Sequence, residues 1–445
     1  MHQRTAVVFP GQGGYLPGAL AAMAHLDEVA EVLDQVDKVA AEAGTASVST
    51  LLTNHGAPMV NSLMLDDPER LHLAIYAGSI ASWRLLSGPL GLVPDVLFGH
   101  SVGELAALTA GGAISVEDGA RLLAARDAAF RAAPPPLGGM LAIPLGSARL
   151  IQLVQGCGLT STHIAADNAP RQSVVSGPDE ELDVLVAALD ALEIEHFQLR
   201  SAYPFHSPLL ATVATRFRPA VQELEVTVPM LPVYSPTRGS YYRDAGSIKA
   251  ALVDHLLLPV HFRQAVTTLY GEGISRFVDT GPKAILADLV EQNLPGAETV
   301  APLRTRCELG AMRAILDGTD AAFVPADSVS PAAVPAAVAA EPVAPAAAVS
   351  VGSVVAMPEL PVLITELQEL YATDLEYPID VMTADADLEA DLAVDSVKQI
   401  ELFTRALKRY GLSQPAGRLR VTSYTTLRRI AALLLDLAAE TGTAR

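Results

Sequence analysis

A Gly-x-Ser-x-Gly turn between an apolar run and an alanine-rich stretch constrains this sequence more than any other feature. Residues 93–98 are typical of a buried strand, and residues 104–112 are good helix formers stopped by two glycines. The strand and the helix must pass so close together that a Cβ atom on Gly99 or Gly103 would clash. The pattern predicts a nucleophile elbow at Ser101. The simpler alternative is a strand-to-helix turn in which the serine only caps the helix.

Length and patterning predict several domains. The chain has 445 residues, half of them apolar, which is too long for one ordinary domain. Strand-like and helix-like runs alternate up to about residue 318, which favours an α/β fold with a mostly parallel sheet. A strand–helix–strand–helix–strand pattern over residues 135–200 predicts an inserted ferredoxin-like subdomain. Residues 319–357 are rich in Ala, Val and Pro and predict a linker, and the apolar spacing over residues 358–445 predicts a small helical bundle.

Charge and cysteine content argue against several classes of protein. The net charge of −20 is unfavourable for nucleic-acid binding. Cys157 and Cys307 lie far apart without His or Cys neighbours at metal spacing, so neither a disulfide framework nor a metal site is expected. No run of about 18 apolar residues indicates a membrane span, and the first residues do not form a signal peptide. We therefore expect a cytoplasmic protein with neither nucleic-acid nor membrane partners.

Ser101 requires a base if it is a nucleophile. His206 is the candidate, because Pro204 and Pro208 stiffen its segment, which has neither helical nor strand periodicity. A histidine fixed in such a loop could take the serine proton and return it to a leaving group. The residues alone leave open the alternative of a loop histidine with no catalytic role.

Six motifs occur in the order and rough spacing of one family. Over about residues 5–317 the sequence resembles the malonyl-CoA:acyl-carrier-protein transacylases, which include the acyltransferase domains of polyketide and fatty acid synthases. The resemblance implies an α/β-hydrolase-like large subdomain with an inserted ferredoxin-like small subdomain. The motifs are Pro10-Gly11-Gln12-Gly13, Gly99-His100-Ser101-Val102-Gly103-Glu104, Arg126, Ala166-Asp167-Asn168-Ala169-Pro170 with Val175-Ser176-Gly177, Phe205-His206-Ser207-Pro208, and Asp279-Thr280-Gly281-Pro282.

The resemblance implies catalytic roles for four of these residues. Ser101 would be acylated by a CoA thioester, with His206 as its general base. The backbone N–H groups of Gln12 and Val102 would form the oxyanion hole. Arg126 would bind the free carboxylate of a malonyl-type substrate as a bidentate pair. Without the resemblance, Arg126 would be interpreted as a solvated arginine on a helix face.

Three further residues gain roles from the same resemblance. Asn168 would contact substrate, and His261 lies where relatives carry Gln or Arg that helps to orient the catalytic histidine. Phe205 and Val102 resemble malonyl-selective members, and a bulky Phe205 would leave little room for an α-methyl group. One methyl group is worth only about 1–3 kcal/mol of discrimination. Malonyl is therefore the expected acyl group, and methylmalonyl is the alternative.

The C-terminal part carries a second motif around Asp395-Ser396. Ser396 and Gln399 have the spacing of a capping box at a helix start. Over about residues 358–440 the sequence also resembles acyl carrier proteins, in which Asp-Ser begins the second helix of a four-helix bundle. This resemblance implies 4′-phosphopantetheine on Ser396, attached by a phosphopantetheinyl transferase. The acidic run from Asp385 to Asp395 suits docking on basic enzyme surfaces.

These features together predict an acyltransferase (residues 1–318) joined by a linker (319–357) to its own acyl carrier protein (358–445). The expected reaction moves malonyl from CoA to a phosphopantetheine thiol, on this carrier or on one in trans, in polyketide or fatty acid biosynthesis. A ketosynthase-containing synthase would be a further partner. One alternative is a thioester hydrolase, which would gain nothing from a cation such as Arg126 at the acyl end. The other is a docking module whose carrier is loaded elsewhere.

Overall fold

The computed structural model describes residues 3–199, 201, 203–304, 308–319, 357–375, 377, 379–388, 392, 394, 396–410, 412 and 424–440. The expected linker lies outside them, apart from residues 319 and 357 at its ends. Cys157 is a free thiol, and Cys307 lies outside the described residues. None of the helices in the described ranges is long and apolar enough to cross a membrane.

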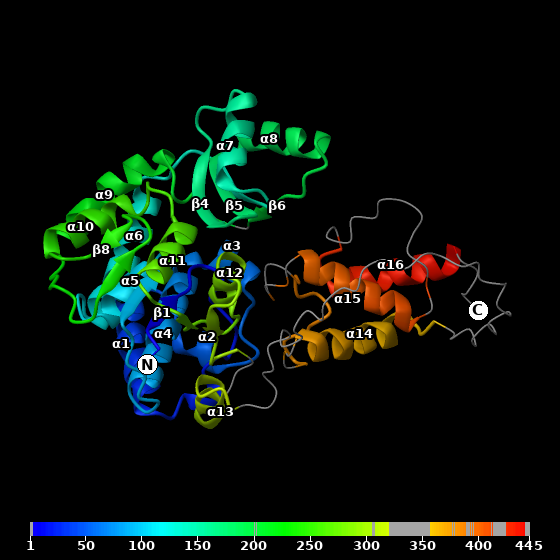
Figure 1. The fold of residues 1–445 in the computed structure, drawn as a ribbon, viewed down its shortest axis with the longest axis horizontal. Coiled ribbons are helices and arrows are strands. Elements are labelled where there is room, and N and C mark those ends of the chain that lie inside the picture. The colour runs from blue at the N-terminus through cyan, green and yellow to red at the C-terminus, as the bar shows by residue number, and fades with distance from the viewer. Residues whose placement is uncertain are drawn as a thin grey trace, which may run out of the picture.

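A six-stranded sheet forms the centre of the main domain (Figure 1). In spatial order its strands are β10 (Glu298–Val300), β9 (Arg276–Asp279), β1 (Thr5–Phe9), β2 (Val96–Gly99), β7 (Val233–Ser235) and β8 (Ser240–Tyr241). All neighbouring pairs are parallel except β7 and β8, so the sheet is mixed and mostly parallel, as expected. β1 and β2 are entirely buried, which explains their unbroken apolar runs.

Helices cover both faces of this sheet. Val7 and Phe9 of β1 belong to one buried cluster, and Ala6 and Val8, which alternate with them, belong to another. The helices are α1 (Asp27–Glu42), α2 (Ser49–Thr53), α3 (Val60–Asp66), α4 (Pro68–Ser87), α5 (Val102–Ala110), α6 (Val116–Ala132), α9 (Ala211–Glu223), α10 (Ala245–Asp254), α11 (Phe262–Gly271), α12 (Ile285–Asn293) and α13 (Leu309–Leu316), with short 3₁₀ turns η1 (Ala21–Met23) and η2 (Pro208–Leu210). The first cluster includes side chains of α1, α4, α5 and α6, and the second includes side chains of α11 and α12.

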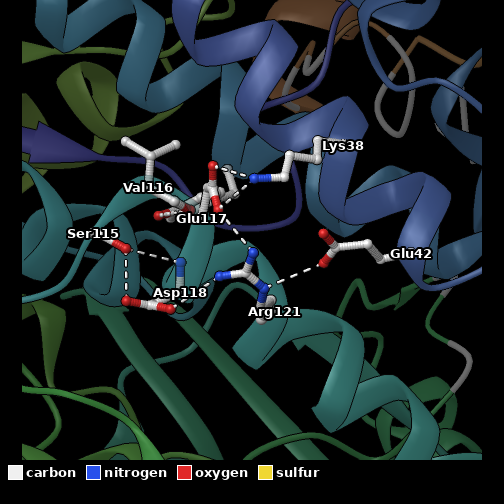
Figure 2. A network of polar contacts seen from close by, with 8 residues as sticks. Lys38, Glu42, Ser115, Val116, Glu117, Asp118 and Arg121 are labelled. Atoms are coloured by element: carbon white, nitrogen blue, oxygen red, sulfur yellow. Dashed lines mark hydrogen bonds and ion pairs between the residues drawn. The ribbon is translucent and has the colours of Figure 1, made fainter.

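The start of α6 is fastened to α1 by a network of charged side chains (Figure 2). Arg121 contacts Glu117 and Asp118 on its own helix and Glu42 on α1, and Lys38 reaches Glu117 across the same interface. Exposed pairs of this kind are individually worth about 0–1 kcal/mol. Their effect is to fix the register between the two helices, and α6 is the helix that carries Arg126.

A small subdomain is inserted between α6 and η2 (Figure 1). It consists of β3 (Gly138–Ile143), α7 (Ser147–Gly156), β4 (His163–Ala169), β5 (Gln172–Pro178), α8 (Asp179–Ala191) and β6 (Phe197–Leu199). Its sheet is antiparallel with the order β4-β5-β3-β6. The sequence pattern missed β4, because Asp167 and Asn168 interrupt its apolar residues and its pairing with β5 shifts register twice.

The C-terminal part contains helices α14 (Leu360–Leu375), α15 (Ser396–Arg409) and α16 (Leu427–Glu440). They share a buried cluster that also includes Leu16 and Ala19 from the segment after β1. The three helices were expected, whereas the fourth has no counterpart among the described residues, which omit 413–423. The capping box is not formed by Gln399, because its Nε2 donates to the Val394 carbonyl oxygen (2.8 Å) and its Oε1 has no partner within the described part of the chain.

Candidate active site

Ser101 occupies a strained turn between β2 and α5. Its φ of 52° and ψ of −127° lie outside the regions that serine ordinarily adopts. A Cβ atom on Gly99 would collide with the Gly103 carbonyl group, and a Cβ atom on Gly103 would collide with the Phe9 carbonyl oxygen. The close approach predicted for the two glycines is therefore present, and the turn has the geometry of a nucleophile elbow.

His206 is hydrogen-bonded to Ser101. Its Nε2 lies 2.9 Å from the serine Oγ, and its Nδ1 lies 3.0 Å from the Leu258 carbonyl oxygen. Since a carbonyl oxygen only accepts, the Nδ1–H donates to it and leaves Nε2 free to accept the serine proton. Burial, followed by the neighbouring His255 and His100, holds the pKa of His206 well below its usual value of 6.5. The imidazole is therefore neutral at pH 7 and can act as a base.

His255 is a neighbour of the pair that the sequence did not reveal. Its Nε2 lies 2.8 Å from the carbonyl oxygen of Ser101, and its ring centroid lies 5.2 Å from that of His206. Burial lowers the pKa of His255, so this imidazole is neutral as well. No sequence signal could have found it, because it directly follows the last residue of α10 and lies in no loop motif.

The parallel register places Gln12 near Ser101. Phe9 pairs with Gly99, so the segments that follow β1 and β2 leave the sheet at the same edge. A Cβ atom on Gly11 would lie 3.3 Å from the Ser101 Cβ. Val102 is the first residue of α5, and its N–H therefore has no partner within the helix. Both backbone groups expected to form the oxyanion hole come from segments next to the serine.

Arg126 is buried, not solvated. It projects from α6, its side chain is 9% exposed, and it lines a mostly apolar pocket together with Val102 and His255. Its Cζ lies 5.9 Å from the ring centroid of Phe205, the residue before His206. The structure thus brings Arg126 and Phe205 to the neighbourhood of the Ser101–His206 pair. The alternative of a solvated helix-face arginine is wrong.

Asn168 and His261 occupy less direct positions. The Oδ1 of Asn168 binds His100 Nε2 at 2.8 Å, so this side-chain oxygen already has a partner beside Ser101. His261 caps α11, and the contacts that it makes in the described structure are backbone hydrogen bonds, one of them to Pro236. The Leu258 carbonyl, and not His261, is the group that orients His206.

Ser396 is the first residue of α15, a helix of 14 residues. Nothing is described of its side chain. A helix N-terminus favours a phosphate group, because its free N–H groups and its dipole attract negative charge. This position is therefore compatible with a phosphodiester on Ser396.

Two family models match the chain. Residues 6–324 match the model described as acyl transferase domain, and residues 365–434 match the model described as phosphopantetheine attachment site. A phenolphthiocerol synthesis polyketide synthase of Mycobacterium marinum is 31% identical over 306 residues, which are 67% of this chain and 14% of that protein. A spectinabilin polyketide synthase protein of Streptomyces orinoci is 31% identical over 67% of this chain and 8% of its own length. The chain thus spans a small part of these curated relatives.

Solved structures resemble the first part of the chain along nearly their whole length. The malonyl CoA-acyl carrier protein transacylase of Coxiella burnetii superposes with a TM-score of 0.64 and 26% identity, covering 71% of this chain and 98% of that one. The malonyl-CoA:acyl carrier protein transacylase of Xanthomonas oryzae gives a TM-score of 0.63 and 29% identity, covering 71% and 99%. The acyltransferase domain from the second module of the salinomycin polyketide synthase gives 0.60 and 28%, covering 71% and 72%.

Proposed function

Because the chain belongs to the acyl transferase family and carries a phosphopantetheine attachment domain, we propose that it moves a malonyl group from coenzyme A to the thiol of an acyl carrier protein. The observation that carries this proposal is the 2.9 Å contact between Ser101 Oγ and His206 Nε2, with the buried Arg126 nearby. The reaction serves biosynthesis of the polyketide or fatty acid type, in which a ketosynthase-containing synthase uses the loaded carrier.

Ser101 and His206 perform the first half-reaction. Ser101 Oγ attacks the thioester carbonyl carbon of malonyl-CoA while His206 Nε2 takes the hydroxyl proton. The oxygen–carbon bond forms, the carbon–sulfur bond breaks, and His206 returns the proton to the leaving CoA thiolate. The backbone N–H groups of Gln12 and Val102 stabilise the negative charge on the carbonyl oxygen as it develops. The product is a malonyl ester on Ser101.

The second half-reaction reverses these steps with a different thiol. His206 takes the proton of the incoming thiol, the new carbon–sulfur bond forms, and the ester bond to Ser101 breaks. The 4′-phosphopantetheine, when attached to Ser396, supplies such a thiol on the chain's own carrier. Leu16 and Ala19 follow the Gln12 segment and share a buried cluster with the carrier helices, which supports loading of this carrier besides others in trans.

Malonyl is the acyl group that this site favours. Arg126 binds its free carboxylate, and Phe205 and Val102 limit the space beside its α-carbon. Asn168 positions substrate only indirectly, through His100. In architecture we interpret the large subdomain as α/β-hydrolase-like, the inserted one as ferredoxin-like and the carrier as a four-helix bundle. The acyltransferase covers residues 1–318, the linker 319–357 and the carrier 358–445.

Intact-protein mass spectrometry tests the proposed function. The phosphopantetheinylated full chain is mixed in turn with malonyl-, methylmalonyl- and acetyl-CoA, and the adducts on Ser101 and Ser396 are measured separately. Malonyl is expected first on Ser101 and then on Ser396. Unchanged malonyl loading of Ser396 in Ser101→Ala would overturn the catalytic role. Release of free acid that outpaces transfer would favour the hydrolase.

A further inference from the structure

Arg126 already has a carboxylate partner inside the protein. Asp127, the next residue of α6, places Oδ1 3.3 Å from an Arg126 terminal nitrogen and 3.4 Å from its Nε. The two side chains are 9% and 6% exposed, so water hardly screens this pair. The carboxylate that approaches Arg126 in the proposed function therefore meets a cation whose charge is balanced.

Asp127 remains ionised in this position. Burial opposes its ionisation, but the charge of Arg126 and the contact with His72 prevail and hold the pKa of Asp127 below its usual value. His72 Nδ1 lies 3.4 Å from the Asp127 Oδ2. Burial, and then Arg126, lowers the pKa of His72, so this imidazole is neutral and adds no charge. The group of three therefore carries one positive and one negative charge.

The contact between Asp127 and Arg126 is too loose for a clamp that orients the guanidinium. A bidentate arginine–carboxylate pair uses two oxygens at about 2.7–2.9 Å. Here a single oxygen lies at 3.3 and 3.4 Å from two nitrogens. The face of Arg126 is instead set by the ring of Phe205, 5.9 Å from its Cζ. Asp127 thus contributes charge more than position, and some Arg126 donors stay available to a substrate.

We propose that Asp127 is a specificity-determining residue, which balances the charge of Arg126 and thereby narrows the preference for dicarboxylic over uncharged short acyl groups. The inference rests on the proposed function, because it concerns the acyl group that Arg126 binds. The wild-type chain accepts acetyl as well as malonyl on Ser101. Removal of the Asp127 charge turns Arg126 into an uncompensated cation, which selects more strongly for a carboxylate.

The test measures the rates at which malonyl-CoA and acetyl-CoA acylate Ser101 of the full chain, by rapid quench and intact-protein mass spectrometry. In Asp127→Asn, which keeps the shape and removes the charge, the malonyl-to-acetyl ratio is expected to rise about tenfold, equivalent to about 1.4 kcal/mol. Asp127→Glu keeps the charge and is expected to retain the wild-type ratio. A purely structural role would lower both rates together and leave the ratio unchanged.

Asp167→Asn is the matched control. Asp167 is a second carboxylate with little exposure, paired with Arg263 at 3.0 Å, and it lies in the small subdomain. Its substitution is expected to change the ratio less than twofold. An equal rise in this control and in Asp127→Asn would overturn the inference, because the effect would then not depend on Arg126.

The wild-type ratio decides the matter even if Asp127→Asn does not fold. A buried cation without its counter-charge separates the two acyl groups by roughly 10²- to 10⁴-fold. A wild-type ratio below about 100-fold is expected, and a larger one would overturn the inference. Absence of any acyl group on Ser101 would overturn the proposed function together with this inference. Acylation with an unchanged ratio in Asp127→Asn would overturn this inference alone.

Discussion

Ser101 Oγ and His206 Nε2 lie 2.9 Å apart although 105 positions separate the two residues in the sequence. Both have a positive φ, 52° and 58°, in which side chains other than those of Gly, Asn and Asp are uncommon. Two strained turns therefore meet at one hydrogen bond. Backbone strain of this kind costs about 1–3 kcal/mol per residue and persists only where the surrounding packing enforces it.

The dyad makes His206 indispensable for acylation. In His206→Ala, Ser101 keeps its position but loses the base, so we expect the rate of Ser101 acylation by malonyl-CoA to fall at least about 10³-fold. Stopped-flow release of CoA measures this rate. His25→Ala, at an exposed histidine of the main domain, serves as control and is expected to retain the wild-type rate. A His206→Ala rate within tenfold of wild type would show that another group takes the proton.

The elbow requires glycine at both flanking positions. Gly103→Ala would place a Cβ atom against the Phe9 carbonyl, and neither β1 nor α5 can move away without breaking the packing around Ser101. We expect a loss of about 3 kcal/mol or more in the free energy of unfolding, at the upper end for overpacked sites. Urea titration followed by circular dichroism measures it. Gly156→Ala, at an exposed helix end with nothing within 4 Å of the added atom, is expected to gain about 0.5–1 kcal/mol. Equal midpoints for the two variants would contradict the argument.

The acid limb of the pH profile reports on His206. An unperturbed histidine with a pKa of about 6.5 would leave about a quarter of the sites neutral at pH 6.0. Since burial holds the pKa of His206 well below 6.5, we expect the kcat/KM for acylation at pH 6.0 to stay within about twofold of its value at pH 7.5. Steady-state assays across pH 5–8 measure this dependence. A half-maximal point at or above pH 6.5 would contradict the neutral, buried imidazole.

Arg126 is expected to act on one substrate class more than on another. Arg126→Ala removes the cation and leaves Asp127 as an unpaired buried anion beside the acyl site. We expect malonyl transfer to fall roughly 10²- to 10⁴-fold and acetyl transfer to fall less than tenfold. Arg126→Lys keeps the charge but not the planar fork, so an intermediate loss is expected. Equal losses for the two thioesters would remove the carboxylate role.

The sequence was most informative where local geometry demands a particular residue. Gly99 and Gly103 betray the elbow, and the prolines around His206 betray a stiff loop. The partners that complete the site could not be predicted, because tertiary packing alone brings them together. The Leu258 carbonyl that orients His206 belongs to a residue with no functional signal in its side chain. His255 reaches Ser101 only through the position of α10.

Asp127 illustrates a second limit. Adjacent helix residues point about 100° apart, so a helical pattern does not predict contact between Arg126 and Asp127. The contact arises because both side chains are buried in the same region, next to His72 of α4. Burial of a polar residue on a helix cannot be read from sequence when the helix is covered on several sides. The same reason made a solvated Arg126 a plausible alternative before the structure was known.

Buried neutral histidines should make the protein sensitive to mild acid. Burial lowers the pKa of four of them, and in the unfolded chain each titrates near 6.5. Below that pH the unfolded chain binds more protons than the folded one, so the free energy of unfolding falls as the pH falls, by up to about 1.4 kcal/mol per pH unit for each histidine. The four are His72, His100, His206 and His255.

Asp279 opposes this trend by one proton. Burial raises its pKa to about 6, so below pH 6 the folded chain binds a proton that an unfolded aspartate does not take up. Four histidines outweigh one carboxyl, and we expect stability in urea to fall between pH 6.5 and 5.5. His255→Gln is expected to make this fall shallower, and His25→Gln, at an exposed site, to leave it unchanged. Stability that is constant or rises as the pH is lowered through this window would show that the buried histidines are protonated in the folded protein.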